Sequence, residues 1–191
     1  MSDKLDVVGI GNAMVDAIIP SNQSEIEKHE INRDSMNLID ENLKNNLHES
    51  YSIREMAGGG SLGNSMFGIT SFGGNGSFIG KIKNDEVGIF LQKDMVREGL
   101  QFPLGFTSPD ISTGCCTIFV EEDGTRTMCT FLGAGTLIGP DDINDQHIKN
   151  HKIAYLEGYL WDNENAKKAM KKMVDICKAD HQQISFTLSD L

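Results

Sequence analysis

The stretch Ala57-Gly58-Gly59-Gly60-Ser61-Leu62-Gly63-Asn64 is a glycine-dense loop that leads into a helix-like segment, residues 64–72. Glycine lets the backbone pass close to a small polar ligand and adopt dihedral angles that are closed to other residues. The free N–H groups at a helix start can then face hydroxyl or phosphate oxygens of that ligand. The stretch therefore predicts a ligand site at a loop-to-helix junction rather than a piece of the core.

Outward from this junction, apolar strand signals alternate with helical ones, which predicts an α/β fold with a mostly parallel sheet covered on both faces. We expect strands over 5–11, 16–19, 35–39, 77–82, 113–121, 125–131, 153–161 and 184–188. We expect helices over 41–49, 64–72, 86–98, 141–148 and 163–179. Strand signals cluster without this alternation in 16–53 and 112–132, which we interpret as a small antiparallel layer beside the main sheet.

The pair Asp123-Gly124 is a strong hairpin signal between the strands expected over 113–121 and 125–131. A two-residue turn there would place Arg126 opposite Glu121 and Cys129 opposite Ile118. No cysteine would then face another across the hairpin, and none has C-x-x-C or zinc-site spacing. We expect reduced, mostly buried thiols at all four cysteines: Cys115, Cys116, Cys129 and Cys177.

Composition and charge exclude several classes of protein. The chain has 191 residues, with 17 Lys and Arg against 28 Asp and Glu, a formal charge of -11. Nucleic acids and anionic membranes require a basic surface, so we expect neither as a partner. The sequence has no apolar run near the roughly 20 residues of a membrane span and no signal peptide at its start. We expect a soluble, cytoplasmic protein, and the five histidines show no spacing for a metal site or a catalytic triad.

Several further motifs accompany the glycine stretch. In chain order the set is Asp6-Val-Val-Gly-Ile-Gly-Asn12 with Asp16, Gly59-Gly60-Ser61 with Asn64, Gly80-Lys-Ile-Lys-Asn-Asp85-Glu-Val-Gly88, Asp123-Gly-Thr-Arg126-Thr, Tyr155-Leu-Glu-Gly158-Tyr and Leu188-Ser-Asp190. This set resembles the ribokinase-like (PfkB) family of sugar and nucleoside kinases over essentially the whole chain. The pair Gly11-Asn12 followed by Asp16 is similar to the adenosine kinase branch.

The resemblance implies a three-layer α/β/α domain with a small β lid that closes over a sugar or nucleoside. It also implies transfer of the γ-phosphate of ATP, aided by Mg²⁺, to a primary hydroxyl. In that family Asp16 would accept hydrogen bonds from the sugar diol, and Arg126 of the lid would approach the phosphoryl group. The other implied contacts are Asn12, Gly59, Gly60 and Asn64 around the sugar, and Cys116, Met128 and Thr130 beside the base.

The residues also have plainer interpretations. Asp16 could be a solvated aspartate at a strand end, and Asn64 could serve only to satisfy free N–H groups at a helix start. Arg126 could pair across the hairpin with Glu121, which would contribute about 0.2–1 kcal/mol. For Asp85, capping of the helix that starts at Glu86 is the simpler role.

Two departures from the family pattern affect the expected activity. Leu62 and Met66 stand where the family usually has small residues. The family's Gly-Ala-Gly-Asp motif with the catalytic base, its Asn-x-x-Glu motif and most of its ATP pocket have no match in the sequence. We therefore expect residues 1–191 to be the N-terminal portion of one truncated domain, inactive alone, with lid segments at about 16–53 and 112–132. An unfinished sheet exposes a strand edge, so we also expect self-association, such as a homodimer.

Two other functions compete with the kinase. One is a non-catalytic module that binds a nucleoside or a partner. The other is an NAD-dependent oxidoreductase, because Gly58-x-Gly60-x-x-Gly63 matches the dinucleotide fingerprint. That fingerprint must directly follow a buried strand, and residues 51–56 are too polar for one. Gly9-x-Gly11-x-x-Met14 lacks the third glycine.

Overall fold

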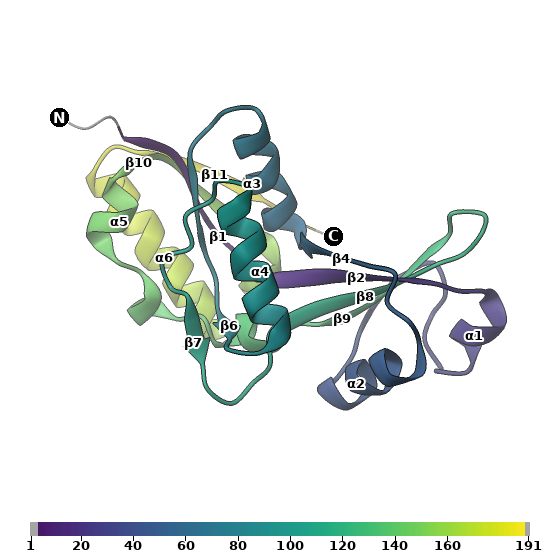
Figure 1. The fold of residues 1–191 in the computed structure, drawn as a ribbon. Helices are drawn as coiled ribbons and strands as arrows, with labels where there is room; N and C mark the ends of the chain where they lie inside the picture. Colours follow the sequence, from purple (N-terminus) through teal and green to yellow (C-terminus); the bar gives the residue numbers. More distant parts are fainter. Residues whose placement is uncertain (1–3, 190–191) are drawn as a thin grey trace.

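The main sheet lies at the centre of the fold, between two layers of helices (Figure 1). The structure is a computed structural model that describes residues 4–189, so Asp190 of the last motif lies outside the described residues. Four parallel strands form the sheet in the order β11-β10-β1-β5. Their bounds are Leu5–Ile10 for β1, Gly76–Ile79 for β5, His151–Glu157 for β10 and Gln183–Thr187 for β11.

Helices cover both faces of this sheet, as the alternation of strands and helices predicts. α3 (Ser61–Ser71) and α4 (Glu86–Arg97) pack on one face, and α5 (Asp145–Lys149) and α6 (Glu164–Ala179) pack on the other. Residues three or four apart share one face of a helix, and on α6 these residues form an apolar stripe against the sheet. The buried stripe includes Ala166, Ala169, Met170, Met173 and Cys177. The expected three-layer α/β/α arrangement is confirmed.

A second sheet, the lid, extends away from the main sheet (Figure 1). Its strands are β3 (Met36–Leu38), β9 (Arg126–Phe131), β8 (Gly114–Val120), β2 (Met14–Pro20) and β4 (Glu55–Gly59), in that order across the sheet. The expected small β layer is therefore present, but it is mixed rather than antiparallel. β2 pairs with β8, and β3 with β9, in parallel. β2 and β8 both leave the main domain in the same direction, which makes their pairing parallel.

The helices α1 (Gln23–Glu27) and α2 (Glu41–Ser50) cover one face of the lid sheet. Together with their flanking loops they bury a small apolar cluster against it. The helix α1 was not expected, although a capping box marks its start. The Asn22 side chain accepts the N–H of Glu25, and the Glu25 carboxylate accepts the N–H of Asn22. This reciprocal pair satisfies two donors that a helix start leaves free.

The hairpin of β8 and β9 has a loop of three residues, so the two-residue register was wrong by one. Glu121 N–H donates to the Thr125 carbonyl (3.0 Å), and Gly124 in the loop has φ +88°. A left-handed glycine at the third loop position is typical of such hairpins. Arg126 consequently pairs with Val120, and Cys129 pairs with Thr117.

Several element boundaries differ from expectation. α3 begins at Ser61 rather than Asn64, and the strand expected over 77–82 is divided into β5 and β6 (Ile82–Lys83), which pairs with the unexpected β7 (Phe106–Ser108). The helix expected over 141–148 is a 3-10 turn (Pro140–Asp142) followed by α5, whose cap is Asn144. β10 ends at Glu157, where the 3-10 turn η3 (Gly158–Asp162) begins.

The cysteines agree with the expectation of reduced, buried thiols. All four thiols are free and buried, and burial raises the pKa of Cys116 to about 11, so this thiol stays protonated at neutral pH. Within residues 4–189, no helix has both the length and the apolar composition that crossing a membrane requires.

Candidate functional site

A cleft of about 1160 Å³ lies between the lid and the carboxyl ends of the main-sheet strands β1, β10 and β11. Ligand sites of open α/β sheets occur at this edge. Seven of the nine side chains or glycines expected at the site line the cleft: Asn12, Asp16, Gly60, Asn64, Cys116, Met128 and Thr130. The other two do not line the cleft: Gly59 contacts the Asp16 side chain, and Arg126 lies next to the hairpin loop.

Asp16 is held in the middle of the lid sheet. On β2 it pairs with Cys116 of β8 on one side and with Ala57 of β4 on the other. The side chain is half-buried, and burial raises its pKa above the ordinary value. A Cβ atom on Gly59 would lie 2.2 Å from Asp16 Cγ, so only glycine leaves room for this carboxylate. Asp16 is therefore a fixed, partly desolvated acceptor in the cleft.

The glycine stretch forms the turn from β4 into α3. Gly60 has φ +83°, a left-handed conformation that residues with side chains disfavour. It is the N-cap of α3, and because it has no side chain, no capping hydrogen bond forms there. Asn64 lies in the first turn of α3, where its backbone N–H donates to the Gly60 carbonyl (3.0 Å). The interpretation of Asn64 as the residue that starts the helix is therefore wrong. Its side chain is exposed and lines the cleft.

Glu157 is the residue that sequence reasoning missed. It ends β10, is 1% exposed, and accepts three N–H groups: Asn12 N (2.8 Å), Asn12 Nδ2 (3.3 Å) and Leu62 N (2.8 Å). Burial raises the pKa of Glu157, while these donors act in the opposite direction. This carboxylate ties the end of β1 to the start of α3. A carboxylate that ends an apolar strand, Ile153-Ala-Tyr-Leu-Glu157, is the signal that could have identified it.

The lid wall of the cleft is largely apolar. Beyond Asp16, the lid residues that line the cleft are uncharged: Met14, Met36, Leu38, Cys116, Ile118, Met128 and Thr130. Leu38 is 65% exposed and Met36 39%, so this wall presents apolar surface to a ligand. Thr130 and Cys116 bind each other through an Oγ1–Sγ hydrogen bond of 3.4 Å.

The opposite wall comes from η3 and β11 and is aromatic. Trp161 packs edge-to-face on Phe186, with 6.4 Å between the ring centroids. Lys167 Nζ lies 5.3 Å from the centroid of the Trp161 ring, a cation–π contact. Tyr159 and Leu188 complete this wall. The cleft thus has Asp16 and Asn64 between the apolar lid wall and a wall of aromatic rings that ends at the exposed carboxylate of Asp162.

Comparison with known proteins identifies the family. The family description "pfkB family carbohydrate kinase" matches residues 6–189. The chain belongs to this family. The computed structure is similar to an adenosine kinase from Sinorhizobium meliloti, with 37% identity and a TM-score of 0.89. It is equally similar in fold to a probable sugar kinase from Rhizobium etli, with 33% identity and a TM-score of 0.89.

The PfkB match extends over only part of these relatives. Each of the two solved structures matches 98% of this chain, and the match covers 57% of each solved chain. A probable fructokinase-2 from Arabidopsis thaliana is 24% identical over 137 residues, which is 68% of this chain and 40% of the fructokinase. The chain therefore spans about half the length of the proteins it matches.

Arg126 is not among the residues that line the cleft. This residue starts β9 next to the hairpin loop and is exposed. The alternative pairing with Glu121 is also wrong, because the Glu121 carboxylate is bound by Arg33 (2.7 Å). A phosphate-side role for Arg126 stays a prediction.

The departures and minor candidates have structural roles. Leu62 and Met66 are fully buried, and Leu62 fills the space left by Gly9 of β1 and by Gly11, which directly follows β1. Asp85 caps α4 as expected by accepting the Gly88 N–H (2.8 Å), and its carboxylate also binds the N–H and hydroxyl of Thr113.

The dinucleotide fingerprint has the wrong surroundings. The polar residues 51–56 argued against a strand before the glycines, yet a strand, β4, does lie directly before α3. β4, however, is a partly exposed edge strand that pairs antiparallel with β2 in the lid. A dinucleotide site needs a buried parallel strand within a βαβ unit, and this context is lacking.

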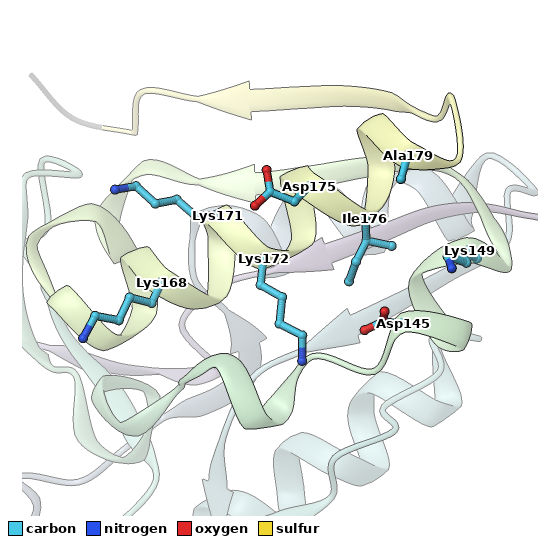
Figure 2. A pocket seen from close by; sticks show the side chains of 8 residues that line it. All are labelled: Asp145, Lys149, Lys168, Lys171, Lys172, Asp175, Ile176 and Ala179. Atoms are coloured by element: carbon cyan, nitrogen blue, oxygen red, sulfur yellow. The ribbon is translucent and has the colours of Figure 1, made fainter.

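A second hollow of about 500 Å³ lies on the outer side of α5 and α6 (Figure 2). Figure 2 shows Lys172 directed from α6 toward the segment before α5, while Lys168 and Lys171 extend away from it. Lys172 Nζ donates to the carbonyls of Pro140 (3.0 Å) and Ile143 (2.8 Å), so its ammonium is already bound. None of the expected site residues lines this hollow.

The described residues do not suit a metal ion. Between Lys4 and Ser189, no three His, Cys, Asp or Glu side chains gather in an arrangement that could hold one. Glu157, the most buried carboxylate at the cleft, is already bound by N–H donors. Glu157 therefore has no free oxygen pair to offer to a Mg²⁺ ion at the cleft.

Proposed function

We propose that this chain forms the acceptor-binding part of a PfkB kinase that phosphorylates a hydroxyl of a nucleoside, with ATP as the donor. The observation that carries the proposal is the position of Asp16. Among the described residues of the lid that line the cleft it is the only charged one, and it lies beside the glycine turn and the first turn of α3.

The ribose of the nucleoside would bind at the polar centre of the cleft. The Asp16 carboxylate would accept hydrogen bonds from the two vicinal hydroxyls, since a charged acceptor forms the stronger hydrogen bonds. Asn12 and Asn64 offer amide groups in the same cleft, and the backbone at Gly59 and Gly60 can approach a ligand closely. Because Asp16 is half-buried, less of its carboxylate is exposed to water that would compete for the diol.

The base would lie against the apolar part of the lid. Leu38, Met36 and Met128 present surface that a free sugar, which has hydroxyls all round its ring, cannot use. A planar base can bury against such side chains, and its burial contributes in proportion to the apolar area removed from water. The 37% identical adenosine kinase is consistent with this preference.

Catalysis in such a kinase is mainly positioning and charge stabilisation around the transferred phosphoryl group. This chain's residues would hold the acceptor hydroxyl in place. The general base and the anion hole of the family motif Gly-Ala-Gly-Asp have no counterpart in residues 1–191. We therefore propose that these residues alone bind the acceptor without turnover.

A free sugar is the second candidate acceptor. Its support is the similarity to fructokinase-2 and to the probable sugar kinase. A hexose would use the same polar centre but leave the apolar walls empty. Titration calorimetry of the chain with adenosine, ribose and fructose separates the two candidates, because only the nucleoside reaches both parts of the cleft.

The variant Asp16→Ala tests the site itself. We expect it to weaken adenosine binding at least tenfold, while Glu122→Ala, which removes an exposed carboxylate from the hairpin loop of the same lid, leaves binding unchanged. Equal affinities of Asp16→Ala and the parent chain would refute the proposed role of Asp16. Tighter binding of fructose than of adenosine would refute the nucleoside assignment.

A further inference from the structure

Asp94 of α4 is a buried aspartate that the site has not used. It is 6% exposed, and its Oδ2 accepts the backbone N–H of Gly58 at 2.8 Å. Its Oδ1 is bound by Arg97, one turn along the helix. A buried carboxylate is costly unless it is hydrogen-bonded, and a bond from an N–H to a charged acceptor is stronger than a neutral one. The contact therefore links α4 firmly to the strand that leads into the glycine turn.

Gly58 belongs to β4, which is an edge strand of the lid sheet. β4 pairs with β2 on one side only, so an N–H that points to the other side has no strand partner. Asp94 supplies the missing acceptor. The approach is close, since a Cβ on Gly58 would lie 2.8 Å from Asp94 Oδ2 and 2.7 Å from the ring of Phe67.

The next residue, Gly59, faces the other way. Successive residues of a strand point to opposite faces, and a Cβ on Gly59 would lie 2.2 Å from Asp16 Cγ. The backbone of Gly58 and Gly59 is therefore enclosed between two carboxylates, one from α4 and one in the cleft. A displacement of β4 away from α4 would therefore change the position of Gly59 relative to the Asp16 carboxylate.

The other end of α4 contacts the strand on the far side of β2. Asp85, its N-cap, accepts the N–H (2.9 Å) and the hydroxyl (2.7 Å) of Thr113, which directly precedes β8. β8 carries Cys116, the residue paired with Asp16. One helix thus holds both neighbours of the strand that carries Asp16.

We propose that Asp94 is a positioning residue for the acceptor cradle and acts on Asp16 through the backbone of Gly58 and Gly59. This inference rests on the proposed function, in which Asp16 binds the acceptor. Asp94 touches no ligand itself. By fixing β4 against α4 it keeps the gap in which the Asp16 carboxylate stands, so that the cradle is formed before the acceptor arrives.

Three variants of the full chain test the proposal. Asp94→Ala removes the acceptor for the Gly58 N–H, whereas Asp94→Asn keeps an amide oxygen at the same place. Glu98→Ala is the matched control, because it removes an exposed carboxylate from the end of α4 that also binds Arg97 but does not reach Gly58. Each variant is examined by amide hydrogen exchange with NMR detection and by calorimetric titration with adenosine.

For Asp94→Ala we expect at least tenfold faster exchange of the Gly58 amide and at least tenfold weaker adenosine binding. Asp94→Asn should restore most of both, and Glu98→Ala should change neither. Rescue by the asparagine would distinguish positioning through a hydrogen bond from a general loss of packing. Unchanged Gly58 exchange in Asp94→Ala would overturn the proposal, and so would unchanged adenosine affinity.

The exchange measurement also separates this proposal from the proposed function. If the parent chain binds neither adenosine nor a sugar, the proposed function fails for this chain. The link from Asp94 to Gly58 is then decided by exchange alone: faster exchange at Gly58 and at its neighbours beside Asp16 supports the positioning role, and unchanged exchange overturns it.

Discussion

Replacement of Glu157 offers the sharpest test of how the cleft is held together. In Glu157→Ala the backbone N–H groups of Asn12 and Leu62, both buried, lose their acceptor. Each unsatisfied buried donor costs about 1–3 kcal/mol. Burial of the Glu157 carboxylate raises its pKa in the folded protein, and this desolvation opposes folding at neutral pH. Removing the carboxylate removes this cost and so offsets part of the loss. We expect a net loss of about 2–4 kcal/mol in the free energy of unfolding.

Glu157→Gln should give an intermediate result for a geometric reason. Glu157 Oε2 accepts both groups of Asn12, and Oε1 accepts the N–H of Leu62. A glutamine oxygen at the first position keeps the Asn12 bonds but turns its NH₂ group toward the Leu62 N–H. One backbone donor is lost instead of two, so we expect about 1–2 kcal/mol.

The assay is urea unfolding followed by circular dichroism, with thermal unfolding in parallel. For a domain of this size each kcal/mol corresponds to about 2–4 °C, so the alanine variant should unfold about 4–16 °C below the parent chain. Glu164→Gln, an exposed glutamate at the start of α6, is the control and should stay within about 0.5 kcal/mol. The reasoning is refuted if Glu157→Ala is as stable as this control, or if glutamine is as damaging as alanine.

Three further outcomes follow from the site and the core. Gly59→Ala places a Cβ 2.2 Å from Asp16 Cγ and should abolish adenosine binding in calorimetry, whereas Gly63→Ala, whose Cβ meets nothing within 4 Å, should keep it and strengthen α3 by up to about 1 kcal/mol. Asp16→Asn should raise the melting temperature at pH 7 while it weakens adenosine binding; burial raises the pKa of Asp16, so the folded state holds more protons there and ionisation opposes folding. Burial lowers the pKa of His151, so the folded state holds fewer protons; urea unfolding should show stability that is full above about pH 6.5 and declines toward pH 5.5, and His151→Gln should reduce this decline.

The elements that sequence reasoning predicted well are those whose signals are local. The apolar stripe of α6 recurs at helical spacing, and the strands β1 and β10 are short apolar runs, so each can be recognised within its own segment. The motifs around Asn12, Asp16 and the glycine turn were recognised in the same way.

The errors occurred where a distant segment decides the local structure. β4 has few strand-forming residues, and it is a strand because its backbone pairs with β2 about 40 residues away along the chain. The hairpin register depended on whether Gly124 lies inside the loop, which the pair Asp123-Gly124 leaves open. Arg126 belongs to the expected hairpin, yet one residue of register separates it from Glu121.

The amino-acid sequence by itself determined the family and the elements with strong local signals, such as β1, β10 and α6, because these depend on periodicity and on motifs within short segments. Only the tertiary structure decided that Glu157 joins Asn12 to α3 across 145 positions, and that Asp94 and Asp16 enclose the same two glycines. A carboxylate looks the same in a sequence whether it binds water, a ligand or a backbone N–H. Its partner is chosen only when folding brings remote segments within hydrogen-bond distance.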